Sequence, residues 1–203
     1  MAWWKDLLFA VPSVVTAVAA VVGARVAWAG LNTWKRETIG KRKAELAESV
    51  LAAFYEARDI INAVRSPATH AGEGHTRERY TLETEEVSHQ LDMYFATIER
   101  LDNKSDFFSK IHAQRYRFQA IFGADSASSF ESLFRIRTEI AVAAHMLMTY
   151  HNAGDVGSLL DNRATWRATI GQHPDNDSIT SRLDNLVEHI EAICRPAIAA
   201  SVR

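Results

Sequence analysis

The amino-acid sequence predicts an all-α protein: a single N-terminal transmembrane helix continues into a cytosolic bundle of four to five helices. Near the N-terminus, eighteen residues without a charge run from Leu7 to Ala24. Beyond them, apolar residues recur mostly at steps of three and four, the spacing of one helix face. No stretch alternates between apolar and polar residues for long enough to form a strand. These observations predict an architecture built from helices alone.

The apolar run has the length and the flanks of a membrane span. As a helix it measures about 27 Å, close to the roughly 30 Å hydrocarbon core of a bilayer. Tryptophan suits the two membrane interfaces, and an excess of Lys and Arg marks the cytoplasmic side. The basic residues would also attract anionic lipid headgroups. The expected membrane-interface residues are Trp3, Trp4, Arg25, Trp28, Trp34, Lys35, Arg36, Lys41, Arg42 and Lys43. We therefore expect a bacterial-type inner (plasma) membrane protein with a short N-terminus outside and its C-terminal domain in the cytoplasm.

Two other interpretations of this segment stay open. The sequence Ala27-Trp28-Ala29 resembles the small-x-small cleavage site of a secretory signal. Against cleavage, the apolar run exceeds the usual 7–15 residues, and Arg25 lies between the run and that site. A buried hairpin of a soluble protein is the other interpretation, and the flanking tryptophans argue against it. The retained anchor agrees best with the sequence.

Small residues recur within the predicted span at spacings that let membrane helices pack closely together. The expected helix-association residues are Ala20, Gly23, Ala24 and Ala27. A span rich in alanine and valine also produces such spacings by chance, so self-association remains one of two alternatives.

The chain divides into four segments. Residues 1–31 form the anchor, 32–65 the juxtamembrane basic segment and a long helix joining the bundle, 66–79 a solvated loop, and 80–203 the rest of the bundle. No proline lies between Pro12 and Pro67, so the anchor and the long helix can form one continuous rod. Further helices are expected from Thr81, from Asn103 or Ser105 to Gly123, from Ser126 or Ser128 to Tyr150, around Ser158–Ile170, and from Asp177 or Ser178, with Pro196 kinking or ending the last.

Charge and cysteine content narrow the function classes. Residues 1–43 hold seven Lys/Arg and two Asp/Glu, a net charge of +5; because the whole chain carries −2, residues 44–203 carry −7. An acidic body argues against general nucleic-acid binding, which uses a basic face. The single cysteine, Cys194, excludes an internal disulfide and a cysteine-rich zinc site, and its helical spacing predicts a small core residue.

Motifs for known catalytic chemistry are absent from the sequence: there is no P-loop, Rossmann fingerprint, HExxH, Gly-x-Ser-x-Gly or kinase signature. We expect no cofactor and no metal site. The expected role is protein interaction or homo-oligomerisation at the cytoplasmic membrane face. The expected partners are the lipid bilayer and either a second copy of the chain or another protein.

One alternative is catalytic. A single membrane helix followed by a helical bundle resembles, in layout, membrane-anchored HEPN-like proteins of prokaryotic defence systems. HEPN ribonucleases use an Arg and a His with four to six residues between them. Such pairs here are Arg65/His70, Arg167/His173 and Arg182/His189, about as many as chance placement gives. Only Arg182 and His189 share one face of a clearly predicted helix. The resemblance implies a defence effector, either a ribonuclease or an oligomeric pore.

Overall fold

A computed structural model describes residues 3–68, 70, 72–81, 83–151, 157–173 and 177–201, and leaves aside the side chains of residues 3–14, 17, 18 and 157–160. In this part of the chain all regular secondary structure is helical, which confirms the predicted all-α class. The elements are α1 (Trp3–Val64), α2 (Glu85–Asp102), α3 (Ser105–Phe122), the short 3₁₀ helix η1 (Ala124–Ala127), α4 (Ser128–Thr149), α5 (Gly157–Ile170) and α6 (Ser178–Ser201).

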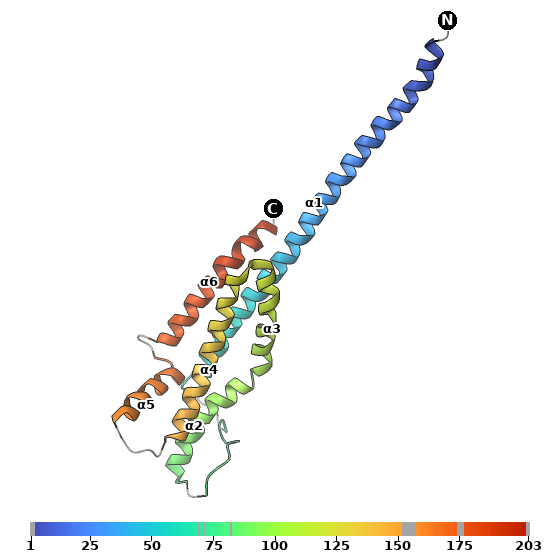
Figure 1. Cartoon of the computed structure of the whole chain (residues 1–203). Helices are drawn as coiled ribbons and strands as arrows, with labels where there is room; N and C mark the ends of the chain where they lie inside the picture. Colours follow the sequence, from blue (N-terminus) through green and yellow to red (C-terminus); the bar gives the residue numbers. More distant parts are fainter. Residues whose placement is uncertain are drawn as a thin grey trace.

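Helix α1 is a single rod of 62 residues, about 93 Å long. Figure 1 shows its C-terminal part inside the bundle and its N-terminal part projecting alone. Among the described side chains of α1, the first buried one is that of Ala44, where the bundle begins. The expected continuity between the residues of the predicted anchor and the 32–65 helix is therefore present, and neither Gly30 nor Gly40 interrupts it.

The described residues contain no helix with a stretch long and apolar enough to cross a membrane. Within the predicted span, the side chains of residues 7–14, 17 and 18 lie outside the description, as do those of Trp3 and Trp4.

The core of the bundle is built around one stripe of α1. Val50, Phe54, Ala57 and Ile61 recur at steps of three and four and are at most 1 % exposed. Phe54 meets Phe130 of α4 edge to face, with ring centroids 5.0 Å apart. The most extensive helix packing in the bundle is between α1 and α6. Since burying one such side chain contributes about 1.5–3 kcal/mol, this stripe accounts for a large share of the stability of the bundle.

Several helix ends differ from the expected ones. Helix α2 begins at Glu85 rather than Thr81, and the side chain of Thr84 accepts a hydrogen bond from the N–H of Val87. The physical reason is the carboxylate of Glu83, which binds an arginine of the preceding connection instead of starting a helix. Asn103 ends α2, so neither expected cap precedes α3. Pro196 lies inside α6, which continues to Ser201.

The sequence predicts a solvated loop over residues 66–79. In the structure, buried side-chain contacts hold the connection between α1 and α2 against α2. Arg77 is 7 % exposed and donates to Glu83 at 2.7 and 2.8 Å and to Asp92 at 3.2 Å. Gly74 has φ +79°, and a Cβ there would lie 2.0 Å from the carbonyl oxygen of Asp92. Only glycine fits at this position, because both the backbone conformation and the space exclude a side chain.

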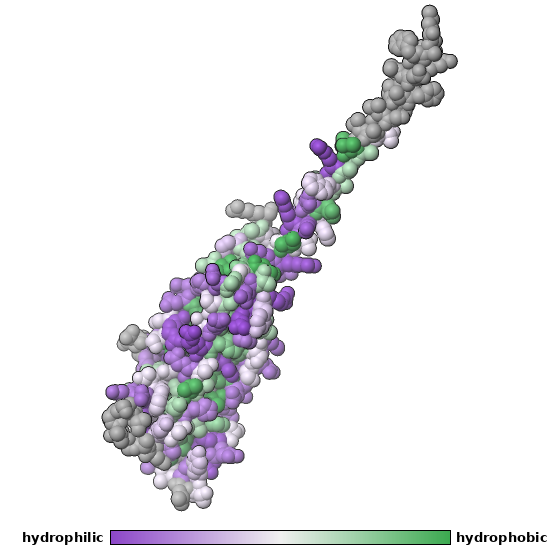
Figure 2. Space-filling view, in the orientation of Figure 1, coloured by the Kyte–Doolittle hydropathy of each residue, from purple (hydrophilic) through white to green (hydrophobic). Residues whose placement is uncertain are grey.

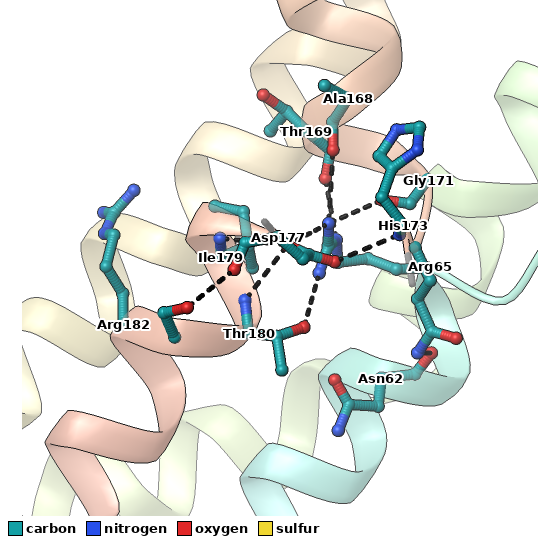
Figure 3. A network of polar contacts seen from close by, with 12 residues as sticks. Asn62, Arg65, Ala168, Thr169, Gly171, His173, Asp177, Ile179, Thr180 and Arg182 are labelled. Carbon is teal, nitrogen blue, oxygen red and sulfur yellow. Dashed lines mark hydrogen bonds and ion pairs between the residues drawn. The ribbon is translucent and has the colours of Figure 1, made fainter. Parts of the chain in front are cut away.

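Arg65 joins the end of α1 to the turn between α5 and α6 (Figure 3). Its side chain is buried, and its guanidinium donates to the carbonyl oxygens of Thr169 at 2.8 Å and Ala168 at 3.2 Å, and to that of Gly171. It also donates to the Asp177 carboxylate at 2.9 Å. The last carbonyls of a helix lack partners within it, so Arg65 satisfies groups that α5 leaves open.

Of the two expected caps of α6, Asp177 and Ser178, the structure has Asp177 in this role. Its Oδ1 accepts from the N–H groups of Ile179 at 3.0 Å and Thr180 at 3.1 Å. Burial by itself raises the pKa of this carboxyl group. The hydrogen bond from Arg65, those from backbone N–H groups and the nearby guanidinium charge outweigh burial and lower the pKa from 3.8 to about 2. The carboxylate therefore stays ionised in the folded protein.

Replacing Arg65 tests this network. The substitution Arg65→Ala leaves a buried carboxylate and three carbonyls without their donor, so we expect a loss of about 3–5 kcal/mol in the free energy of unfolding, measured by urea denaturation. The matched control is Arg117→Ala, which removes an exposed arginine from α3 and is expected to change stability by about 0.5 kcal/mol or less. Equal effects of the two substitutions would contradict the role given to Arg65.

The same network predicts a pH dependence. Because the folded pKa of Asp177 lies below its ordinary value of 3.8, its contribution is complete above about pH 4 and is lost as the pH falls toward 2. Unfolding free energies measured from pH 5 to pH 2 are expected to fall less steeply in Asp177→Asn than in the parent protein. Asp161→Asn, which alters an exposed side chain of α5, serves as the control. Identical pH profiles for the parent and Asp177→Asn would refute the prediction.

Candidate functional site

The N-terminal part of α1 presents apolar side chains to the surroundings on all sides. Every described side chain from Val15 to Leu31 is exposed. An α-helix turns about 100° per residue, so Val21, Val22 and Leu31 point in three well-separated directions. Figure 2 shows apolar patches, interspersed with polar ones, along the described part of this segment. Its large apolar residues, 56–70 % exposed, are Val15, Val21, Val22, Val26, Trp28, Leu31, Trp34 and Ile39.

The four predicted helix-association residues lie on one face of this segment. Ala20, Gly23, Ala24 and Ala27 are spaced by three and four residues and are all exposed. A Cβ added at Gly23 would meet no atom within 4 Å. Within the described part of the chain nothing covers this face, so it is open to a helix from another molecule.

The predicted interface residues with described side chains lie between the apolar segment and the bundle or at the end of that segment. Arg25, Trp28, Trp34, Lys35, Arg36, Lys41 and Arg42 are exposed. Lys43 is half-buried at the bundle edge, with its Nζ 4.9 Å from the centre of the Phe122 ring. Apart from Arg25, which precedes both of these tryptophans, the order along α1 is thus apolar residues, tryptophans, basic residues and bundle.

A second feature is a groove between α4 and α6, with a volume of about 340 Å³. We call it the α4–α6 groove. Both residues of the predicted catalytic pair, Arg182 and His189, line it. The other lining residues are Ser128, Ser129, Ser132, Arg135, Ile136, Asn185 and Leu186. None of these described residues is acidic, although the body of the protein carries a net negative charge.

Helical spacing places these side chains together. On α6, Arg182, Asn185 and His189 follow at steps of three and four, and on α4 Ser132 and Arg135 do the same. Arg182 donates from Nη1 to Glu139 of α4 at 2.8 Å, and both side chains remain about 40 % exposed. Figure 3 shows Arg182 pointing away from the Arg65–Asp177 network, so the two arginines serve different parts of the bundle.

Arg135 is the cationic residue of the groove with the fewest contacts. It is exposed on α4, and no described residue forms an ion pair or hydrogen bond with it. A guanidinium has five N–H donors, and Arg182 directs one of its nitrogens to Glu139. The groove therefore contains unused donors from both helices.

The other two Arg/His pairs are not joined. Arg65 is committed to Asp177 and to backbone carbonyls rather than to His70. Among the described residues, no hydrogen bond or ion pair links Arg167 to His173 either. Arg182/His189 is thus the one pair of the three whose members line a common groove in the described structure.

Larger hollows surround the connection between α1 and α2, with volumes of about 610 and 820 Å³. Ion pairs border these hollows: Arg100 pairs with Glu73, Arg77 with Glu83, and Arg79 with Asp92. These pairs hold the connection in place, and the larger hollow also has the acidic residues Glu85 and Glu86 in its lining. The α4–α6 groove is smaller but keeps unpaired polar donors.

Cys194 is a poor nucleophile, and the described histidines take part in no metal site. Cys194 is fully buried, and burial raises the pKa of its thiol to about 11, so the thiolate that acts as a nucleophile is scarce at neutral pH. In the described ranges, no group of three or more His, Cys, Asp or Glu side chains could hold a metal ion.

Sequence reasoning missed Arg135 and the serines at the start of α4. It treated Ser126 and Ser128 as helix caps, whereas Ser128 here donates from its hydroxyl to the carbonyl of Asp125. The available signal was the spacing of Ser128, Ser132 and Arg135, which share one helix face. That face could be recognised as part of a groove only once the packing of α4 against α6 was known.

Comparison of the chain with protein-family models, with curated proteins and with solved structures finds no significant match.

Proposed function

We propose that the protein is anchored in a membrane by the N-terminal part of α1 and acts at the cytoplasmic membrane face through protein interaction or homo-oligomerisation. The observation that carries the proposal is the projecting segment of α1, with large apolar side chains 56–70 % exposed on all sides. Helices that are apolar all round are buried in a protein interior or in a membrane. Each such side chain left in water forgoes about 1.5–3 kcal/mol of burial free energy.

The order of residues along α1 agrees with insertion of its N-terminal part in a bilayer. The charge-free run precedes Trp28 and Trp34, and the basic residues Lys35, Arg36 and Lys41 follow before the bundle starts. Tryptophans at the interface and basic residues on the cytoplasmic side are the pattern of a bacterial-type inner membrane protein. With this orientation, the short N-terminus lies outside and the bundle lies in the cytoplasm.

Homo-oligomerisation through the anchor is supported by the exposed face of Ala20, Gly23, Ala24 and Ala27. Small residues at these spacings let two backbones approach within a membrane, where van der Waals packing drives helix association. A second copy of the chain carries the same face, which makes a symmetric contact available.

Membrane association is tested with charged substitutions in the projecting segment. The double substitution Val14→Lys/Val15→Lys places two charges in the middle of the Leu7–Ala24 run, where each costs about 2.5–3.5 kcal/mol at the centre of a bilayer. We expect it to move most of the full-length protein out of the lipid fraction in vesicle flotation, with a lower carbonate-resistant membrane fraction in cells. The control Val142→Lys places a lysine on a 45 % exposed apolar residue of α4 and is expected to float like the parent. A parent protein that fails to float would refute the anchor.

A second candidate function is a HEPN-like ribonuclease, favoured by the groove that Arg182 and His189 share. In this function His189 would act as general acid or base on a ribose hydroxyl or a leaving oxygen, and Arg182 would neutralise the developing phosphate charge. The acidic charge of residues 44–203 weighs against this candidate relative to the first.

The catalytic candidate predicts that Arg182→Ala and His189→Ala each abolish RNA cleavage by the purified full-length protein. The matched control is Arg117→Ala on α3, which leaves the groove intact and should leave cleavage unchanged. Cleavage that persists in both groove variants, or that is absent from the parent protein, would remove the ribonuclease from consideration.

A further inference from the structure

We propose that the α4–α6 groove binds the phosphate group of a small, soluble phosphate ester. The inference goes beyond the proposed interaction role and requires no catalysis. The groove gathers two guanidiniums and an imidazole, from Arg135, Arg182 and His189, with no acidic side chain among its lining residues. Residues 44–203 as a whole carry a net charge of −7. Two guanidinium groups in a groove without acidic lining residues are a specific feature of this acidic body rather than a consequence of its composition.

The donors come from two helices and face one volume. Arg135 forms no ion pair with any described residue, so its guanidinium is available for a bidentate contact to an oxyanion. Planar guanidinium groups match the spacing of phosphate oxygens, which makes arginine the preferred residue for such recognition. Ser132 and Asn185 add neutral donors on either side.

Glu139 is a positioning residue for this groove. Its Oε2 accepts from Nη1 of Arg182 at 2.8 Å and so restricts the orientation of that side chain. The guanidinium keeps four of its five N–H donors for other acceptors. Glu139 itself does not line the groove.

The size of the groove favours a small ligand. A volume of about 340 Å³ lies at the lower end of the range for small-molecule sites, roughly 300–1,000 Å³. Ile136 and Leu186 supply buried apolar surface beneath the polar side chains. This combination suits a phosphate attached to a compact organic group, such as a nucleotide.

The distance of the groove from the bilayer argues for a soluble ligand and against a lipid headgroup. This step rests on the proposed anchor. Ser201 and Gly40 line the same hollow at the membrane-facing end of the bundle. Helical rise places Gly40 about 9 Å below Trp34, and His189 about 18 Å below Ser201. His189 therefore lies about 27 Å from the interfacial tryptophan, whereas the headgroup region is only about 5–8 Å thick on each side.

The test is binding of inorganic pyrophosphate and of adenosine diphosphate to the full-length protein in detergent micelles, measured by isothermal titration calorimetry at low salt. We expect saturable binding of one ligand per chain by the parent protein. Arg135→Gln should weaken this binding by about tenfold or more, since a hydrogen bond to a charged group contributes about 1.5–3 kcal/mol. Arg117→Gln removes an exposed arginine outside the groove and should bind like the parent.

Arg135 is exposed and forms no ion pair with a described residue, so its replacement should leave folding intact, and circular dichroism spectra verify this. Failure of the parent to bind either probe, or equal binding by Arg135→Gln and the parent, would overturn the proposal. Mixed micelles containing phosphatidylglycerol form a separate arm: competition at equal phosphate concentration would assign the groove to lipid headgroups and overturn the soluble ligand. The binding readout depends neither on membrane insertion nor on RNA cleavage, so its outcome is separate from that of either proposed function.

Discussion

Helix α1 is one continuous helix with two different parts: the C-terminal part packs inside the bundle, and the N-terminal part projects from it. From Ala44 onward its apolar stripe is buried against α3, α4 and α6, whereas its described side chains from Val15 to Leu31 are all exposed. This division makes the molecule elongated along α1, because the other helices pack along one end of the rod and leave the other end bare (Figure 1). The proposed anchor and the proposed oligomer contact both follow from that division, since both use the bare end.

Buried arginines hold the far end of the bundle in its shape. Arg65 fastens the turn between α5 and α6 to the end of α1, and Arg77 fastens the connection that precedes α2. Each one satisfies carboxylates or carbonyls that would otherwise be buried without partners, which explains their low exposure despite a permanent charge. Arg135 and Arg182 differ in kind, because they lie on exposed helix faces and border an open groove.

Helical periodicity was sufficient to predict the class of the fold. The absence of proline between Pro12 and Pro67 allowed the continuity of α1 to be predicted, and residue type narrowed the cap of the last helix to Asp177 or Ser178. These sequence patterns were not sufficient for features that depend on contacts between distant residues. The sequence predicts a helix start at Thr81. In the structure Arg77 binds the carboxylate of Glu83, and α2 begins at Glu85. In the sequence, Arg65 is a charged residue at the end of a predicted helix. Its place in a buried network depends on Asp177, which is distant in the sequence. The α4–α6 groove shows the same limit, since Arg182 and His189 could be paired by spacing on one helix whereas Arg135 joins them from another.

The most direct test of the membrane anchor is fluorescence quenching by brominated lipids, with the full-length protein reconstituted in vesicles. In one variant Trp28 is the only tryptophan, and in the other Trp166 is, with the remaining tryptophans replaced by phenylalanine. Trp166 stacks on Tyr150 within the bundle and provides the internal reference. Insertion of α1 predicts strong quenching of Trp28 and little quenching of Trp166. Equal and weak quenching of both would mean that the exposed apolar segment of α1 lies outside the bilayer, which contradicts the account.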